Sequence, residues 1–198
     1  MLEYGDMVSG ILTEAGGCPD MVLERNLRNS AIEFFNATEL WKTTLVSIVP
    51  SNHQVDVKSL LAAGNSLVRV EGASIDGVSL KPVDSLRVLR TNSKEYFASE
   101  GSDVYLSNKH PEDATVDIRV SIKPNLQSEG IPIDLASDWF EALGWGALYR
   151  VLGMEGSPWA DLRRAGFYQQ QYSSMIEQGI RVARGSNKPR ILNTRFSW

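Results

Sequence analysis

The spacing of hydrophobic positions near the start of the chain predicts a long amphipathic helix. Apolar or small residues recur at steps of three and four from Leu23 to Trp41, and the charged residues mostly avoid that stripe. This is the period of a helix with one buried face. Pro19 suits its first turn, where the N–H that proline lacks would be unused. We expect about five or six turns here, preceded by a shorter helix over residues 6–14 that ends at Gly16-Gly17.

Between residues 43 and 124 the period changes to the alternation of β-strands. In the segment TVDIRVSI, apolar residues alternate with polar ones, which predicts one buried face and one that is wet or covered by a partner. Both Asp76-Gly77 and Glu100-Gly101-Ser102 favour hairpins. The segment VDVKSLLAAGN fits either a strand or a short helix. Together these segments predict about five to seven strands in a small antiparallel sandwich or barrel.

Helical spacing returns in the last third of the chain. Gly144 and Gly146 lie within a helix, where each costs about 1 kcal/mol relative to alanine, so we expect another backbone to pass close to them. Trp145 falls off the apolar stripe, which favours a helix packed on two sides, as in an oligomer. Ser157-Pro158 fits the cap and first turn of a final helix that ends near Gly185.

The order of these zones predicts an α+β fold. Helices from the two ends form a helical bundle, and the β module between them is an insertion that closes on itself. We expect N-terminal helices over residues 1–42, the β module over 43–124, C-terminal helices over 125–185 and an extended C-terminal arm over 186–198.

Composition and charge fit a globular protein with a basic end. The chain has 198 residues, 42% of them hydrophobic and 22% charged, and its net charge is −4. Five bases and no acid follow Glu177, so of the total of −4 this end contributes +5 and the rest −9. Because the whole chain is negatively charged, we do not expect it to attract nucleic acid through its overall charge. The basic end is either a solvated surface or an arm that docks on an acidic partner.

The single cysteine and the absence of long apolar runs bear on the compartment. Cys18 has no partner for an intrachain disulfide, which fits a reducing environment. Its place at a helix start favours a lower thiol pKa, but without a nearby histidine in the sequence we expect a quiet thiol. No secretory signal pattern and no run of about 18 apolar residues occur, so we expect no membrane span.

Residues that carry chemistry are sparse. His53 and His110 lie in predicted loops without metal-ligand spacing, and we expect both to be surface histidines. Asp134, Asp138 and Glu141 lie near a helix start, where the helix dipole and solvent account for them. No phosphate-binding glycine motif and no nucleophile elbow occur, although a triad assembled in space stays open. We expect no enzyme activity, no cofactor and no metal.

Three segments carry a resemblance that covers nearly the whole chain. They are CPDMVLERNLRNSAIEFFNATELWK, YFASEGSDVYLSNKHPEDATVDIRVSIKPN and DWFEALGWGALYRVLGMEGSPWADLRRAGFYQQQYSSMIEQGIRVARG. In this order, and with a short basic tail, they resemble the head-to-tail adaptor (connector) proteins of tailed bacteriophages, in particular those of short-tailed phages. The most telling part is GALYRVLGMEGSPWADLRRAGFY, in which a helix with small residues precedes a glycine break, Pro-Trp and a long helix.

The resemblance implies a structural protein of the virion neck, made in the cytoplasm of the host bacterium. Such adaptors form a homo-oligomeric ring, typically of twelve copies, under the portal protein. The ring carries the tail hub or nozzle, and DNA passes through it during packaging retention and ejection without sequence-specific binding. In such adaptors a C-terminal segment usually inserts into the portal, and the resemblance implies this role for the arm over 186–198. The candidate anchors in the arm are Lys188, Arg190, Ile191, Leu192, Arg195, Phe196 and Trp198. The ring-packing candidates are Trp139, Gly144, Trp145, Gly146 and Trp159.

Two alternatives to the adaptor are another neck or tail-completion ring protein and, in a different class, a soluble hydrolase or ligand-binding β module. An enzyme should show a pocket with convergent polar groups and perturbed titrating residues. A connector should show two large partner interfaces and a helix-lined channel.

Overall fold

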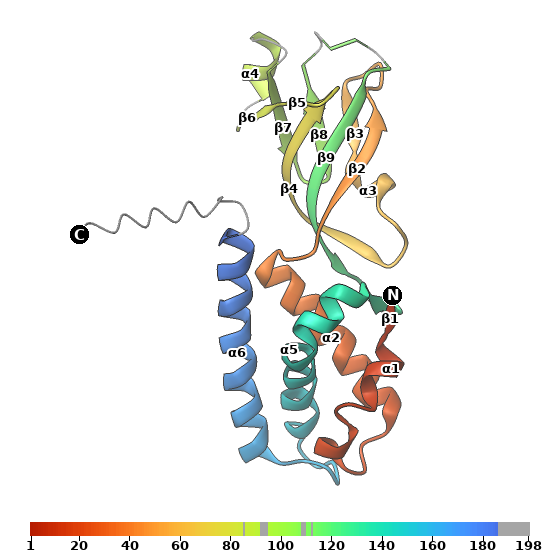
Figure 1. The fold of residues 1–198 in the computed structure, drawn as a ribbon, viewed down its shortest axis with the longest axis vertical. Coiled ribbons are helices and arrows are strands. Elements are labelled where there is room, and N and C mark those ends of the chain that lie inside the picture. The colour runs from red at the N-terminus through yellow and green to blue at the C-terminus, as the bar shows by residue number, and fades with distance from the viewer. Residues whose placement is uncertain (85, 92–94, 108–109, 112, 186–198) are drawn as a thin grey trace, which may run out of the picture.

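The fold combines helices from both ends of the chain with strands from its middle. The computed structural model describes residues 1–84, 86–91, 95–107, 110–111 and 113–185, and the predicted arm over 186–198 lies outside them. Helices occupy one end of an elongated molecule and strands occupy the other (Figure 1). The predicted α+β class is confirmed.

The helical end contains the segments that the helical periodicity indicated. They are α1 (Tyr4–Val8), the 3-10 helix η1 (Leu12–Ala15), α2 (Asp20–Thr38), α5 (Ile133–Leu152) and α6 (Leu162–Gly185). α5 packs against both α2 and α6, and α1 packs against α2 (Figure 1). Helices that are distant in the sequence therefore share one core.

The first helices differ from the sequence prediction at two boundaries. The helix expected over residues 6–14 is divided into α1 and η1 by a turn, where Gly10 packs closely against the ring of Phe140 on α5. α2 ends at Thr38, because Glu39 adopts a left-handed backbone with a φ of 55°. A residue in this conformation ends a helix.

The start of the last helix was also predicted wrongly. α6 begins at Leu162, because the side chain of Asp161 accepts a hydrogen bond of 3.0 Å from the N–H of Arg164 and so caps the first turn. Ser157, the expected cap, instead donates its hydroxyl to the carbonyl oxygen of Met154 over 2.8 Å. The segment between Ser157 and Asp161 is thus part of the connection between α5 and α6.

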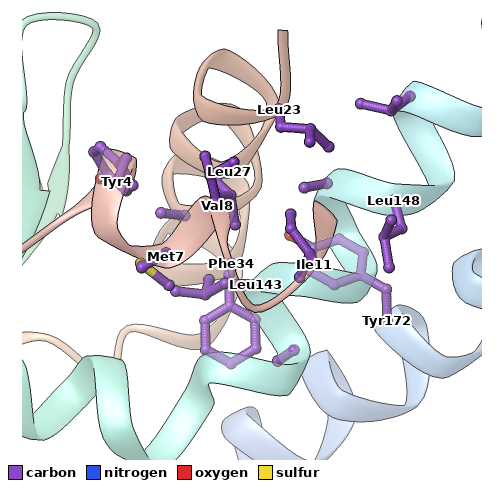
Figure 2. Packing of buried hydrophobic residues seen from close by; sticks show 14 of the residues in the cluster. Tyr4, Met7, Val8, Ile11, Leu23, Leu27, Phe34, Leu143, Leu148 and Tyr172 are labelled. Carbon is purple, nitrogen blue, oxygen red and sulfur yellow. The ribbon is translucent and has the colours of Figure 1, made fainter. Parts of the chain in front are cut away.

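Aromatic side chains join the three long helices in the core shown in Figure 2. The ring of Phe34 on α2 is fully buried. Its centroid lies 5.1 Å from that of Trp139 on α5 and 6.4 Å from that of Tyr172 on α6. Aromatic pairs at such separations add about 0.5–1.5 kcal/mol beyond the burial of their surface. The apolar stripe predicted for α2 therefore faces both later helices.

Two four-stranded sheets share the hydrophobic core of the β end. The first, in the order β2-β9-β4-β5, consists of β2 (Lys42–Ile48), β9 (Thr115–Pro124), β4 (Asn65–Ile75) and β5 (Val78–Ser79). The second, in the order β3-β8-β7-β6, consists of β3 (Gln54–Asp56), β8 (Asp103–Leu106), β7 (Tyr96–Glu100) and β6 (Lys81–Pro82). Two short helices also lie in this part, α3 (Val57–Leu60) and α4 (Leu86–Thr91).

The alternation predicted for β9 is confirmed on its apolar face. Ile118 and Val120 are fully buried, in the same core as Phe97 of the second sheet. The opposite face of β9 is only partly exposed to solvent. Ser121 is fully buried there and donates its hydroxyl to Glu71 on β4. Side chains of the same chain, such as Glu71, therefore shield part of this face from solvent.

Both predicted hairpins are confirmed. Asp76 and Gly77 connect β4 to β5 with φ values of 48° and 80°, in the left-handed region that a type I′ turn requires. Gly101, with a φ of 60°, lies in the connection between β7 and β8. The ambiguous segment VDVKSLLAAGN contains both structures, because the side chain of Asp56 ends β3 and caps α3 by accepting the N–H of Lys58 over 2.9 Å.

A short two-stranded ladder ties the start of the chain to the segment that leads from the β end into α5. It pairs β1 (Leu2–Glu3) with β10 (Gly130–Ile131). A Cβ at Gly130 would overlap the carbonyl oxygen of Leu2, so this close approach requires glycine. Such a short ladder has no alternation of its own, and it was not predicted from the sequence.

Candidate interaction surfaces

The glycines of α5 are points of close helix packing. A Cβ at Gly146 would overlap the hydroxyl oxygen of Ser30 on α2 and would lie 2.7 Å from a ring carbon of Tyr172 on α6. A Cβ at Gly144 would lie 2.9 Å from a methyl carbon of Ile11. The predicted close approach is confirmed, but the neighbours are side chains of the same chain rather than another backbone.

The tryptophans predicted to pack a ring lie in the helical core or at its edge. Trp139 is buried against Phe34, whereas Trp145 and Trp159 are half-buried. Trp145 and Phe140 line a groove of about 290 Å³ between η1, α5 and α6. Packing within the chain accounts for contacts on several sides of α5. A role of these residues in a ring therefore stays a prediction.

Arg150 links the three long helices, a role that its helical spacing did not indicate. Its guanidinium donates to the carbonyl oxygen of Gly146 and forms an ion pair with Glu33 on α2. It also lies 4.5 Å from the ring centroid of Tyr149 and 5.6 Å from that of Tyr172. Burial raises the pKa of Tyr172, so its phenol stays protonated and can donate a hydrogen bond. This cluster fixes α5 between its neighbours.

The junction between the helical and β ends carries a half-buried carboxylate, that of Glu71. Glu71 forms a 2.9 Å ion pair with Lys42 at the start of β2 and accepts a 2.6 Å hydrogen bond from Ser121. Burial raises the pKa of Glu71, but the hydrogen bonds from Ser121 and Lys42 and the charge of Lys42 outweigh it, so the pKa lies below its ordinary value. The ionised form is thus the one that the fold stabilises.

Glu71→Gln is expected to lower stability only while the wild-type carboxylate is ionised. Because folding lowers the pKa of Glu71, the group contributes stability above its unfolded-state pKa and loses it as the pH falls through its folded-state pKa. We expect a loss of about 1–2 kcal/mol at pH 7. Thermal unfolding at a series of pH values measures the difference in stability between the wild type and the variant. This difference should disappear at acidic pH, where Glu71 is protonated. Glu95→Gln is the matched control. Glu95 also forms an ion pair with a lysine, with 3.8 Å between its carboxylate oxygen and Nζ of Lys81, but both side chains are exposed. A difference that persists unchanged into acid would contradict this role.

Large apolar side chains are exposed on elements of both ends. The exposed fractions are 62% for Val46 and 58% for Ile48 on β2, and 61% for Leu162 and 55% for Phe167 on α6. Single exposed apolar residues are ordinary. Here they recur on a strand and a helix that belong to different hydrophobic clusters. β2 and α6 each carry at least two such side chains, so both elements are candidates for contact with other chains.

The described residues offer little for catalysis. Among them, no group of three or more His, Cys, Asp and Glu side chains is placed to hold a metal ion. His110 is buried, contrary to the expected surface position. The Nε2 atom of His53 lies 3.1 Å from the carbonyl oxygen of His110. Burial, and then the charge of Asp20, raise the pKa of the Cys18 thiol, as a quiet thiol requires.

The carboxylates near the start of α5 are exposed, in agreement with the solvated role expected for them: Asp134, Asp138 and Glu141. In the described part of the chain, we find no helix that combines the length and hydrophobicity of a membrane span.

Comparisons with known proteins assign no family. No family model matches the chain, and no curated protein matches it at a significant level. The class of protein must therefore be inferred from its residues and its geometry.

Proposed function

We propose that this chain is a head-to-tail adaptor of a tailed bacteriophage, a structural protein rather than an enzyme. Copies of the chain form a ring under the portal protein, of twelve copies by resemblance, and the ring carries the tail hub or nozzle. The helical bundle builds the ring, the inserted β sandwich faces outward or toward the tail, and the arm over 186–198 inserts into the portal. The resemblance of the segment GALYRVLGMEGSPWADLRRAGFY supports this assignment.

The observation that carries the proposal is the exposure of apolar side chains at both ends of an elongated molecule (Figure 1). Val46 and Ile48 lie on the β end, and Leu162 and Phe167 lie on the helical end. A protein that joins two partners needs separated interfaces, and a ring also needs heterologous contacts that close. Exposed apolar residues of this kind suit contact surfaces better than a catalytic pocket, in which polar groups converge.

The charge distribution supports a role beside passing DNA. The arm over 186–198 holds three bases and no acid, which gives it a charge of +3. Because the whole chain has a net charge of −4, residues 1–185 have a net charge of −7. Proteins grip DNA mainly through Lys and Arg contacts to phosphates. An acidic body lets DNA slide through a channel without adhering, and a basic arm reaches toward a partner.

The test is assembly on a purified portal ring from the phage that encodes the chain. Single-particle mass measurement of the chain alone, of the portal ring alone and of the mixture should show a defined number of chains added per portal. Electron microscopy of the mixture should place the added density under the portal. A chain that stays monomeric with portal present at micromolar concentration would overturn the adaptor assignment. Addition to an assembled neck but not to a bare portal would favour another neck or tail-completion protein.

A further inference from the structure

β2 is an open edge of the sheet β2-β9-β4-β5. It pairs with β9 over seven residues, in an unbroken register from Lys42 opposite Ser121 to Ile48 opposite Thr115. The ladder continues at each end, where the carbonyl oxygen of Trp41 and the N–H of Val49 bond to the segment of β9. Hydrogen-bonded residues alternate in an antiparallel pair, so the odd-numbered residues of β2 bond to β9. The N–H and C=O groups of the even-numbered residues therefore point to the open side.

Among the described residues, the other edge strands of the two sheets have features that hinder pairing with a further strand, and β2 lacks these features. β3 has three residues, β5 has two, and β6 has two with Pro82 as its second. β4 is covered at one end by β5 and has two register shifts against β9. Short strands, proline and bulges are the usual protection against unwanted strand pairing. β2 has none of them, and its outer face presents the exposed side chains of Val46 and Ile48.

A strand that fits this edge occurs in the chain itself. In the sequence LNTRFSW, residues 192–198, large apolar residues stand at three of the four even-numbered positions, and every odd-numbered position is polar. Leu192, Thr194, Phe196 and Trp198 form one set, and Asn193, Arg195 and Ser197 form the other. Alternation of this kind places each set on one side of a strand. The segment also equals β2 in length, with seven residues.

The end of α6 brings this segment to the start of β2. Ala183 and Arg184, in the last turn of α6, line a cavity of about 190 Å³ together with Lys42 and Arg69. The connection from α6 to residue 192 has six residues, 186–191, and spans at most about 20 Å. β2 is about 23 Å long, so the connection reaches the Lys42 end more readily than the Ile48 end. This favours a parallel arrangement.

We propose that residues 192–198 add to the open edge of β2 of the same chain as a parallel strand in the free protein. The main-chain groups of Thr44, Val46 and Ile48 bond to the added strand, and Phe196 and Trp198 cover Val46 and Ile48. Because the connection is short, the added strand is present at an effective concentration of about a millimolar, without a second molecule. The inference does not depend on the proposed ring. If both hold, the arm leaves β2 when it enters the portal.

Hydrogen exchange of single amides tests this inference, because neighbouring amides of β2 have different partners. In the full chain, the amides of Thr44, Val46 and Ile48 should exchange at least tenfold more slowly than in a chain that ends at residue 185. The amides of Leu45 and Ser47, which point to β9, should be protected equally in both and serve as an internal control. Equal exchange of the three edge amides in the two chains would overturn the inference.

Two valine substitutions at opposite edges of the same sheet complete the test. Val46→Lys places a charge on the edge of β2 and should return the exchange of Thr44 and Ile48 to the rate of the shortened chain. Val78→Lys makes the same change at a similarly exposed position on β5 and should leave these rates unaltered. Protection that rises with protein concentration together with a dimer mass would overturn the intrachain strand in favour of a second copy.

Discussion

Gly146→Leu is expected to destabilise the helical end severely. Even a Cβ at this position would overlap the hydroxyl of Ser30 and press on the ring of Tyr172, so a leucine forces α2 and α6 away from α5. The displacement would also break the 2.9 Å hydrogen bond that the phenol of Tyr172 donates to the carbonyl oxygen of Ser30. Overpacking of a tight core costs about 3 kcal/mol or more. For a chain of this size that lowers the Tm by about 6–12 °C.

Gly166→Ala is the matched control for this change. Gly166 lies within α6, is exposed, and would place a Cβ where no atom lies within 4 Å. Removing a glycine from an exposed helix interior should stabilise the protein by about 0.5–1 kcal/mol. Calorimetry of the two variants beside the wild type should thus give Tm shifts of opposite sign. A Gly146→Leu protein with an unchanged Tm would show that the three helices can yield to added bulk.

Local periodicity predicted those elements whose pattern reports burial directly. α2 lies where steps of three and four marked it, and β9 buries the face that alternation assigned to the core. The hairpin at Asp76-Gly77 was predictable because few residues adopt two successive positive φ values without strain. In these places the local preference and the tertiary fold favour the same structure.

The boundaries that were predicted wrongly depend on competition between nearby signals. Ser157-Pro158 and Asp161 are both acceptable helix starts, and the structure uses Asp161 because its side chain caps the N–H of Arg164. The first helix stops early where Gly10 meets Phe140, a residue far away in the sequence. Tertiary contacts of this kind leave no local pattern.

The contacts at the candidate surfaces were predictable only in part. The sequence indicated that Gly144 and Gly146 are close-approach positions, because a helical glycine is otherwise unfavourable. It could not name Ser30 or Tyr172 as their neighbours. The ion pair of Glu71 with Lys42 was missed for the same reason, because it depends on the register of strands that are separated in the chain.

Removal of residues 188–198 is expected to abolish binding to the portal while the fold stays intact. The described hydrophobic clusters are formed by residues that precede this segment, so the shortened chain should still fold and unfold cooperatively. The segment holds three bases, four large apolar side chains and no acid, and aromatic and Arg anchors carry most of the energy of such contacts. Titration of portal rings with the full and shortened chains should show a loss of about 100-fold or more in affinity. Equal affinity of the two chains would show that the arm is not the anchor.

Two pairs of substitutions separate the contributions of the arm. Phe196→Ser with Trp198→Ser should raise the dissociation rate from the portal, because buried aromatic anchors govern how long a complex lasts. Arg190→Ser with Arg195→Ser should lower the association rate and its dependence on salt, because long-range charge mainly steers encounter. Val46→Lys leaves every arm residue in place, so portal affinity should be retained or increased if the arm is held on β2 in the free protein. A loss of affinity in Val46→Lys would instead assign β2 to the portal interface.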